Sequence, residues 1–426
     1  MVCRVNWQGE RFELTVDRPG HGGVCVGRRD GRVIFVRDAL PGERLVVRVT
    51  EDKGKSFCHA QIEEIVDAAP GRIDVACRAH AAGVGCCDAS HMTGTASREI
   101  KATVLADLLQ RLGGGIGWNG DIESIAAEPD SSIVETGWRG RMRLGVDAQG
   151  RPGMHARGGA VVPTLDCAAA ADGLVVGLPD AAAGSEVVVV LDDAGDRHVV
   201  ELAGVSQRRG GKRARAQQHR ASAAKVRRES VLAGSGVANW RVGDRTWHLP
   251  AAGFWQSHRN AAASYSTVVG DMLAASGVDR AAVGWDLFGG GGPLAAAMRG
   301  VTDEVHVVES DRRAVEAGAL AFADDTAVHF HPDRVDRVVA DLPAPDVVVL
   351  DPPRAGAGVG VVDAVCAAGP RAVVHVGCDP ATFARDLADF GRHGYRPTVI
   401  RGFDAFPMTH HFEAIALLTP GAAAQQ

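Results

Sequence analysis

The side chain best placed for nucleophilic chemistry is the thiol of Cys378. It directly follows the apolar run AVVHVG, which predicts a buried strand, and it precedes Asp379 and Pro380, which are typical of a helix start. A thiol near a helix N-terminus can have a lowered pKa, and the thiolate is the reactive form. Cys366, by contrast, lies in the amphipathic stretch VVDAVCAAG, and we expect it to pack as a small apolar residue.

A second candidate is Glu413, which lies in FPMTHHFEAIALL just inside an apolar run that predicts a closing strand. A carboxylate in an apolar strand is costly unless it is paired or functional, so this position indicates chemistry. The adjacent His410 and His411 are suited to proton transfer, but we expect them to face solvent.

A glycine-rich turn at residues 286–292 (DLFGGGG) indicates a nucleotide-type ligand. Glycines let the backbone approach a ligand closely, and the helix that opens at Pro293 contributes a positive dipole. Glu309 ends the next predicted strand about 20 residues later, where a carboxylate can hold a ribose hydroxyl pair. This pattern fits NAD-dependent enzymes nearly as well as enzymes that use S-adenosylmethionine (SAM).

The sequence DVVVLDPPRAG favours the SAM interpretation, because it places Asp351 after the fourth predicted strand. Ligands of open α/β sheets bind at that edge. The two prolines remove amide donors and stiffen the turn, so the carboxylate points in a fixed direction. A purely structural turn is the alternative.

An alternating β/α pattern that begins near Val283 must position these side chains. Five apolar runs alternate with helical segments, which predicts a doubly wound, mainly parallel sheet within a catalytic domain at residues 251–426. Residues 67–250 predict a mixed α+β central domain. It contains a helical stretch at 95–112 and a strand pair joined by the turn DAQGRPG at 147–153.

Residues 1–66 predict a small β-barrel, because short β-branched runs alternate there with the turn signals GHGG, RRDGR and PGE. The stretch GHGGVCVGRRDGRVIFVRDALPGERL resembles a TRAM domain, an OB-like RNA-binding module. A barrel with a purely structural role is the alternative. We expect Cys3, Cys25 and Cys58 to be packing residues.

The net charge of -6 conceals a segregation of charge along the chain. Residues 1–60 carry a surplus of +3 and residues 207–228 a surplus of +9, whereas residues 301–426 have a deficit of -8. A polyanion would therefore meet the first two segments. A solvated linker is the alternative for 207–228. With no run of roughly 18 apolar residues and no signal-peptide core, we expect a cytoplasmic protein with no membrane partner.

Together, DLFGGGG, Glu309, LDPPRAG, GCDPATFARDL and FPMTHHFE resemble the RNA uracil-5-methyltransferases, which act on transfer or large-subunit ribosomal RNA. FWQSH at 254–258 matches another motif of that family, so the resemblance covers nearly the whole chain. It implies a Rossmann-like, seven-stranded SAM methyltransferase domain, with Cys378 as nucleophile and Glu413 as general base. It also implies a SAM site lined by Gln256, Phe288, Glu309, Asp341 and Asp351.

Two positions depart from the family pattern. Gly289 stands where the family usually has cysteine. Pro293 stands where a polar residue, often asparagine, is common, so one cofactor contact of the family is not assigned here. Neither change removes a group that the chemistry needs.

The cysteines of the central domain predict a metal site. Nine cysteines in a cytosolic chain argue against a disulfide framework. Related methyltransferases carry a four-iron, four-sulfur (4Fe-4S) cluster on a Cys-x5-Cys-x2-Cys segment and one distant cysteine. Here the segment reads Cys-x8-Cys-Cys with Val84 at one ligand position, so Cys86 is the expected replacement. The predicted ligands are Cys77, Cys86, Cys87 and Cys167. Zinc on the same thiolates and unmetallated cysteines are the alternatives.

The resemblance implies a SAM-dependent enzyme that forms 5-methyluridine through a covalent bond between Cys378 and carbon 6 of the target uracil. The TRAM module and the cysteines favour 23S ribosomal RNA, because the transfer-RNA branch usually lacks both; transfer RNA is the alternative. A non-catalytic RNA-binding protein and an NAD-linked oxidoreductase are the alternatives from other classes. The presence of both Cys378 and Glu413 argues against the first of these. We expect a monomer.

Overall fold

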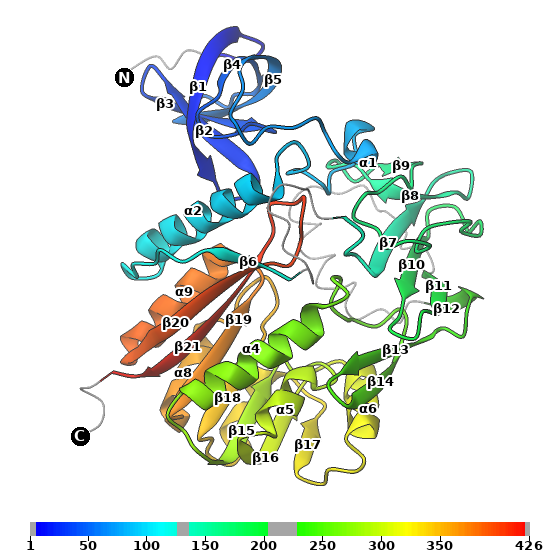
Figure 1. Cartoon of the computed structure of the whole chain (residues 1–426), viewed down its shortest axis with the longest axis vertical. Helices are drawn as coiled ribbons and strands as arrows, with labels where there is room; N and C mark the ends of the chain where they lie inside the picture. The colour runs from blue at the N-terminus through cyan, green and yellow to red at the C-terminus, as the bar shows by residue number, and fades with distance from the viewer. Residues whose placement is uncertain (1–5, 126–135, 203–227, 422–426) are drawn as a thin grey trace.

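The computed structural model describes residues 6–125, 136–202 and 228–421, which form a barrel, a central sheet and a C-terminal β/α sheet (Figure 1). The basic segment 207–228 lies outside the described residues apart from Arg228, so neither interpretation of it is tested. Within the described ranges, no helix combines the length and the apolar character that a membrane crossing requires.

The N-terminal barrel forms because its strands alternate buried apolar and exposed polar residues. Leu14 and Val16 point inward with their polar neighbours outward, the period-two pattern of a sheet with one buried face. Cys25 and Cys58 are buried in this core, as expected. The barrel closes in the order β1-β2-β3-β5-β4. Its strands are β1 (Arg11–Gly20), β2 (Val24–Arg29), β3 (Arg32–Arg37), β4 (Arg44–Glu51) and β5 (Phe57–Asp67).

The central region contains a six-stranded sheet in the order β12-β11-β10-β7-β8-β9, and a separate hairpin of β13 and β14. Strands β7 and β8 flank the turn expected at 147–153. The elements are α1 (Arg78–Ala81), α2 (Gly94–Leu112), β6 (Ile122–Ser124), β7 (Arg141–Val146), β8 (Pro152–His155), β9 (Val161–Val162), β10 (Glu186–Leu191), β11 (Arg197–Leu202), β12 (Glu229–Ala233), β13 (Val237–Val242) and β14 (Arg245–Pro250).

The C-terminal part alternates strands and helices as predicted. Its elements are α4 (Ala261–Ala275), β15 (Ala281–Leu287), α5 (Pro293–Met298), β16 (Thr302–Val308), α6 (Arg312–Ala321), β17 (Val328–His331), α7 (Val335–Val338), the 3-10 helix η1 (Val339–Asp341), β18 (Val347–Leu350), α8 (Val359–Ala368), β19 (Ala372–Gly377), α9 (Pro380–Arg392), β20 (Tyr395–Asp404) and β21 (Glu413–Pro420).

These strands form an eight-stranded sheet in the order β17-β16-β15-β18-β19-β21-β20-β6. Strands β17 to β19 in this order are mutually parallel, and β21 is antiparallel to both of its neighbours. The chain order runs outward in both directions from β15 and β18, and this reversal opens a crevice at the carboxyl ends of the strands. Helices α4, α5 and α6 contribute to the apolar core on one face, and α2, α8 and α9 to the core on the other.

The C-terminal sheet also includes a strand from before the expected domain boundary at residue 250. The seven strands from β15 to β21 match the predicted methyltransferase sheet, but β6 from the central region adds an eighth by pairing in parallel with β20. Its Ile122 is buried beside Leu105 of α2 in the core beneath α9. An apolar strand end and an apolar helix face from residues 94–124 thus complete the catalytic sheet.

Candidate active site and cysteine cluster

The glycine-rich turn connects β15 to α5 with an unusual backbone. Phe288 has φ +61°, and Gly290 and Gly292 have φ +57° and +82°. A bulky residue with positive φ is strained, and such positions gather at functional sites. Glu309, directly after β16, accepts a hydrogen bond from the backbone N–H of Gly290 at 3.2 Å. The predicted ribose-binding carboxylate is therefore hydrogen-bonded directly to the glycine turn.

Asp286 lies at the base of this turn and is a residue that sequence reasoning missed. Its Oδ2 accepts a hydrogen bond from Ala295 N at 3.0 Å, whereas its buried Oδ1 has no partner within the described part of the chain. Burial raises the pKa of Asp286 to about 8. A Cβ at Gly289 would lie 2.7 Å from the Asp286 carboxyl carbon, which explains why glycine suits that position here. An acid inside an apolar strand was the available signal, as it was for Glu413.

The other predicted cofactor residues come from separate segments. Asp351 directly follows β18 and is half-buried, so it shares the carboxyl edge of the sheet with Phe288 and Glu309. Gln256 is half-buried between β14 and α4, and Asp341 is exposed at the end of η1. Pro293 opens α5 at its first position, where the missing N–H is not needed by the helix.

Cys378 stands between β19 and α9, as predicted. Asp379 caps the helix by accepting hydrogen bonds from Ala381 N and Thr382 N, both at 3.0 Å. The predicted lowering of the thiol pKa is wrong: burial and the nearby carboxyl groups of Glu413 and Asp351 raise the pKa of Cys378 to about 12. The charge repulsion and the lost hydration together outweigh the favourable helix terminus.

Glu413 is the first residue of β21 and is only 3% exposed. Its Oε2 is buried and has no hydrogen-bond partner among the described residues. Burial, and then the charge of Asp351, raise the pKa of Glu413 well above its usual value, while Arg354 acts in the opposite direction. At this edge of the sheet, Glu413 and Asp351 thus raise the pKa of Cys378, and Asp351 raises the pKa of Glu413. Arg354, which lies in the motif LDPPRAG and had no predicted role, supplies the positive charge that lowers the pKa of both Cys378 and Glu413.

The expectation that His410 and His411 face solvent holds only in part, because both are half-buried. Nδ1 of His410 lies 2.7 Å from Oδ2 of Asp88, and burial lowers the pKa of His411 to about 3. The barrel also reaches this edge, because His21 Nε2 lies 3.5 Å from Oδ2 of Asp379, next to Cys378. Only the folded arrangement reveals these contacts, since the partners are hundreds of residues apart in sequence.

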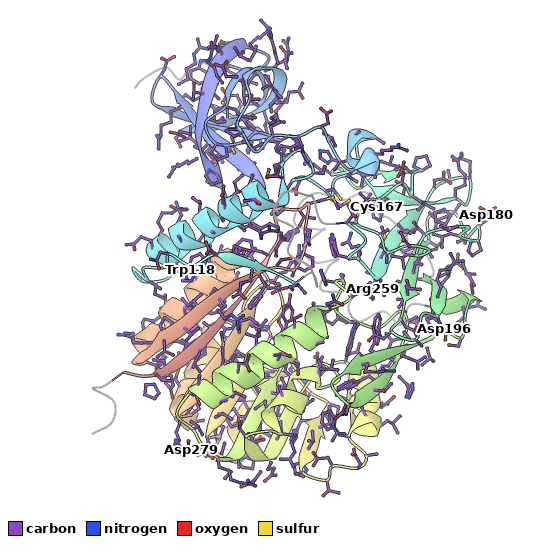
Figure 2. All side chains as sticks on the ribbon, viewed as in Figure 1. Trp118, Cys167, Asp180, Asp196, Arg259 and Asp279 are labelled. Carbon is purple, nitrogen blue, oxygen red and sulfur yellow. The ribbon has the colours of Figure 1, made fainter. Side chains whose placement is uncertain are left out.

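The four predicted cysteine ligands meet in the central region. Cys77 precedes α1, Cys86 and Cys87 follow it, and Cys167 lies close to α1, where Asp166 O accepts a hydrogen bond from Ala79 N (Figure 2). The sulfur atoms of Cys77, Cys87 and Cys167 lie within 4.8 Å of one another, and Cys86 Sγ lies 3.6 Å from Cys87 Sγ. Contacts with the neighbouring thiols lower the pKa of Cys86 and of Cys167 and raise the pKa of Cys87.

Val84, which occupies one ligand position of the family spacing, is buried in the apolar cluster that surrounds these thiols. Four converging soft ligands, three of them buried, suit zinc or an iron–sulfur cluster better than a hard cation.

An aromatic group on the barrel surface joins β3 and β5. The ring centroids of Phe35 and Phe57 are 5.7 Å apart, and His59 stacks on Phe35 at 5.5 Å. Phe57 is 37% exposed, with Lys55 Nζ 6.0 Å from its ring. Exposed rings beside a positive charge are typical of surfaces on which nucleic-acid bases stack. A second exposed aromatic residue, Phe254, is 69% exposed two positions before Gln256, and sequence reasoning gave it no role.

The chain resembles known proteins over nearly its whole length. Residues 7–58 match the TRAM domain family, and residues 316–420 match the family described as tRNA (Uracil-5-)-methyltransferase. An uncharacterised RNA methyltransferase of Corynebacterium efficiens is 42% identical over 98% of this chain and 96% of its own length. The 23S rRNA (uracil(1939)-C(5))-methyltransferase RlmD of Alkalilimnicola ehrlichii is 29% identical over 96% of each chain.

A solved structure shares the fold. The Pyrococcus abyssi tRNA (uracil-54, C5)-methyltransferase in complex with S-adenosyl-L-homocysteine matches 95% of this chain and 99% of its own, with a TM-score of 0.68 at 19% identity. These findings confirm a SAM-dependent enzyme over the NAD-linked alternative and over the non-catalytic scaffold. The chain belongs to the TRAM-containing family of RNA uracil-5-methyltransferases, which are SAM-dependent enzymes.

Proposed function

We propose that the chain methylates carbon 5 of a uridine in 23S ribosomal RNA through a covalent bond to Cys378. The observation that carries the proposal is the placement of Cys378 and Glu413 at the carboxyl edge of the sheet, where the charge of Glu413 raises the pKa of Cys378. The glycine turn and Glu309 lie at the same edge, where SAM would place its methyl group.

The chemistry follows from the weak nucleophilicity of carbon 5. The Cys378 thiolate adds to carbon 6, and the electron pair of the 5,6 double bond moves to give an enolate that makes carbon 5 nucleophilic. Carbon 5 then takes the sulfonium methyl group of SAM, and S-adenosylhomocysteine leaves. Glu413 removes the proton from carbon 5, the bond between sulfur and carbon 6 breaks, and the double bond is restored.

The pKa values of Cys378 and Glu413 indicate which protonation changes must accompany the binding of RNA and SAM. Cys378 has a pKa of about 12, so its thiol is mainly protonated in the free protein near neutral pH. Burial raises the pKa of Glu413, which favours the protonated form of this carboxyl group. Arg354 lowers the pKa of each and therefore favours the ionised forms that the reaction uses. We assign Arg354 this electrostatic role. The target base must also leave its stack to reach a buried thiol.

Ribosomal RNA is favoured over transfer RNA by two features of the chain. RlmD, which is named for 23S rRNA, matches over 96% of its length. The four gathered thiols are the second feature, because the sequence resemblance associates such a cluster with the ribosomal branch. The barrel rings Phe35 and Phe57, together with Phe254, offer surfaces on which unstacked RNA bases would lie.

We further propose that Cys77, Cys86, Cys87 and Cys167 hold a 4Fe-4S cluster. The fit rests on four converging thiols, three of which are buried. When bound, the cluster would cross-link α1 to the Cys167 loop. Zinc is the alternative occupant, which metal analysis separates from iron.

The test uses single-turnover methyl transfer from labelled SAM to unmodified fragments of 23S rRNA and to unmodified transfer-RNA transcripts. The native chain should label an rRNA fragment at carbon 5 of one uridine, as mass spectrometry would map. Cys378→Ala should abolish transfer and retain SAM binding, while Cys366→Ala, a matched half-buried thiol of the same domain, should remain active.

Glu413→Gln provides the second arm. It should transfer the methyl group and then retain RNA covalently, giving a slow band on a denaturing gel. Labelling by Cys378→Ala would disprove the nucleophile, and labelling of transfer RNA alone would disprove the ribosomal target.

A further inference from the structure

The chain has two tyrosines, and their hydroxyl groups differ in hydrogen bonding. Tyr395 Oη donates to Pro370 O at 2.8 Å. Tyr265, on α4, is only 2% exposed, and its buried hydroxyl has no partner anywhere in the described ranges. Buried tyrosine hydroxyls normally find a partner, because leaving one unpaired costs free energy. The unpaired hydroxyl of Tyr265 therefore indicates a functional role.

Packing places Tyr265 behind the general base. Its ring contacts Phe403 edge to face, with centroids 6.3 Å apart, and Phe403 of β20 lies directly opposite Glu413 of β21 in the sheet register. Helix α4 also packs against β19, which ends next to Cys378. Tyr265 thus lies on the inner side of the catalytic edge.

Among the described residues, Glu413 likewise lacks a hydrogen-bond partner, on an atom that can accept the hydrogen bond of a hydroxyl group. Its Oε2 is buried and unpaired in the same way as the Tyr265 hydroxyl. Burial, and then the charges of Glu413, Asp351 and Cys378, raise the pKa of Tyr265, so the phenol stays protonated and remains a donor. A protonated donor and an acceptor oxygen, both buried and both unpaired, are close enough to interact electrostatically.

We propose that Tyr265 is a positioning residue that donates its hydroxyl hydrogen to the Glu413 carboxylate when Glu413 ionises to act as general base. The inference rests on the proposed function, because Glu413 must act as a base for the contact to matter. A hydrogen bond to the ionised form of a buried acid stabilises that form selectively.

Other charged groups around Glu413 do not supply this donor. Asp351 disfavours its ionisation, and Asp404 is paired with Lys101. Arg354 favours ionisation through its charge, with no hydrogen bond to Glu413 among the described contacts. Tyr265 is therefore the neutral donor available on the buried side.

The experiment compares Tyr265→Phe with Tyr395→Phe in the full chain, using the 23S rRNA fragment that the native chain methylates. Rapid quenching and denaturing gels measure two rates, formation of the protein–RNA adduct and its resolution, from pH 6 to pH 9. Thermal unfolding of each variant is the second readout.

Tyr265→Phe should form the adduct at the native rate and resolve it about tenfold more slowly, the effect of one lost charge-assisted hydrogen bond. The pH at which resolution is half-maximal should rise, because Glu413 loses stabilisation of its charged form. Its melting temperature should not fall, since the deleted hydroxyl was unpaired. Tyr395→Phe should melt at a lower temperature and keep both rates and the pH profile.

Native resolution rate and pH profile in Tyr265→Phe would overturn the inference, as would equal slowing of formation and resolution. Failure of the proposed function looks different, because the native chain would then form no adduct with any RNA tested.

Discussion

Asp88 accepts two hydrogen bonds from His410, one from the backbone N–H to Oδ1 at 3.0 Å and one from Nδ1 to Oδ2 at 2.7 Å. Asp88 directly follows Cys87, and His410 lies three residues before Glu413. A further bond from Ala89 N to Met408 O, at 2.9 Å, joins the same two loops. The loop that carries two of the gathered thiols therefore also holds the loop that leads into Glu413, the proposed general base.

Asp88→Ala should destabilise the protein by about 2–4 kcal/mol, because it removes two charge-assisted hydrogen bonds at a buried position. It should also lower methyl transfer, since the loop before Glu413 loses its anchor. Urea unfolding and single-turnover labelling measure the two effects. Asp74→Ala, at an exposed position of the same segment, is the matched control. Equal stability of both variants would show that the two loops are held by other contacts.

Alkylation of Cys378 should rise steeply with pH. With a pKa of about 12, the thiolate fraction of the free protein is ~10⁻⁴ at pH 8 and grows about tenfold per pH unit up to pH 10. Peptide mapping after brief treatment with iodoacetamide measures this rate for Cys378 alone. Arg354→Gln should lower the rate at every pH in this range, because the arginine lowers the pKa of the thiol. A rate that levels off near pH 7 would contradict the raised pKa.

Five of the seven strands from β15 to β21, and the residues at their ends, could be predicted because both depend on local pattern; β17 and β20 were not predicted. Alternating apolar runs placed Cys378 and Asp351 at strand ends, and the structure has them after β19 and β18. The pKa of Cys378 could not be predicted, because it depends on burial in the folded protein and on Glu413 and Asp351, which are distant in sequence. The same limit applies to β6, whose three residues are too short to form a pattern and join the sheet through Ile122 packing on α2.

The protein purified without oxygen should contain about four iron atoms and absorb broadly near roughly 400 nm, as thiolate-ligated clusters do. Serine at Cys77, Cys86, Cys87 or Cys167 should remove most of the iron, whereas Cys366→Ser should keep it, because Cys366 lies on α8 away from the cluster. Cys86→Ser is the decisive variant, because Cys86 is the expected replacement for the cysteine ligand that the family has at the position of Val84. Full iron content in Cys86→Ser would exclude Cys86 as a ligand, and zinc in place of iron in the native protein would exclude the cluster.

Phe57→Ala should weaken RNA binding by about 1–3 kcal/mol, the usual contribution of one ring on which a base stacks. Ile65→Ala is the matched control, because Ile65 lies on the same strand β5 and is 39% exposed against 37% for Phe57. The dependence of affinity on salt should be unchanged in Phe57→Ala, since the ring neutralises no phosphate, whereas Lys55→Ala should reduce the slope by about one. Point substitutions suit this question better than removal of the barrel, which would also remove His21 from Asp379 beside the nucleophile. Equal RNA affinity of the Phe57 and Ile65 variants would show that this face of the barrel does not contact RNA.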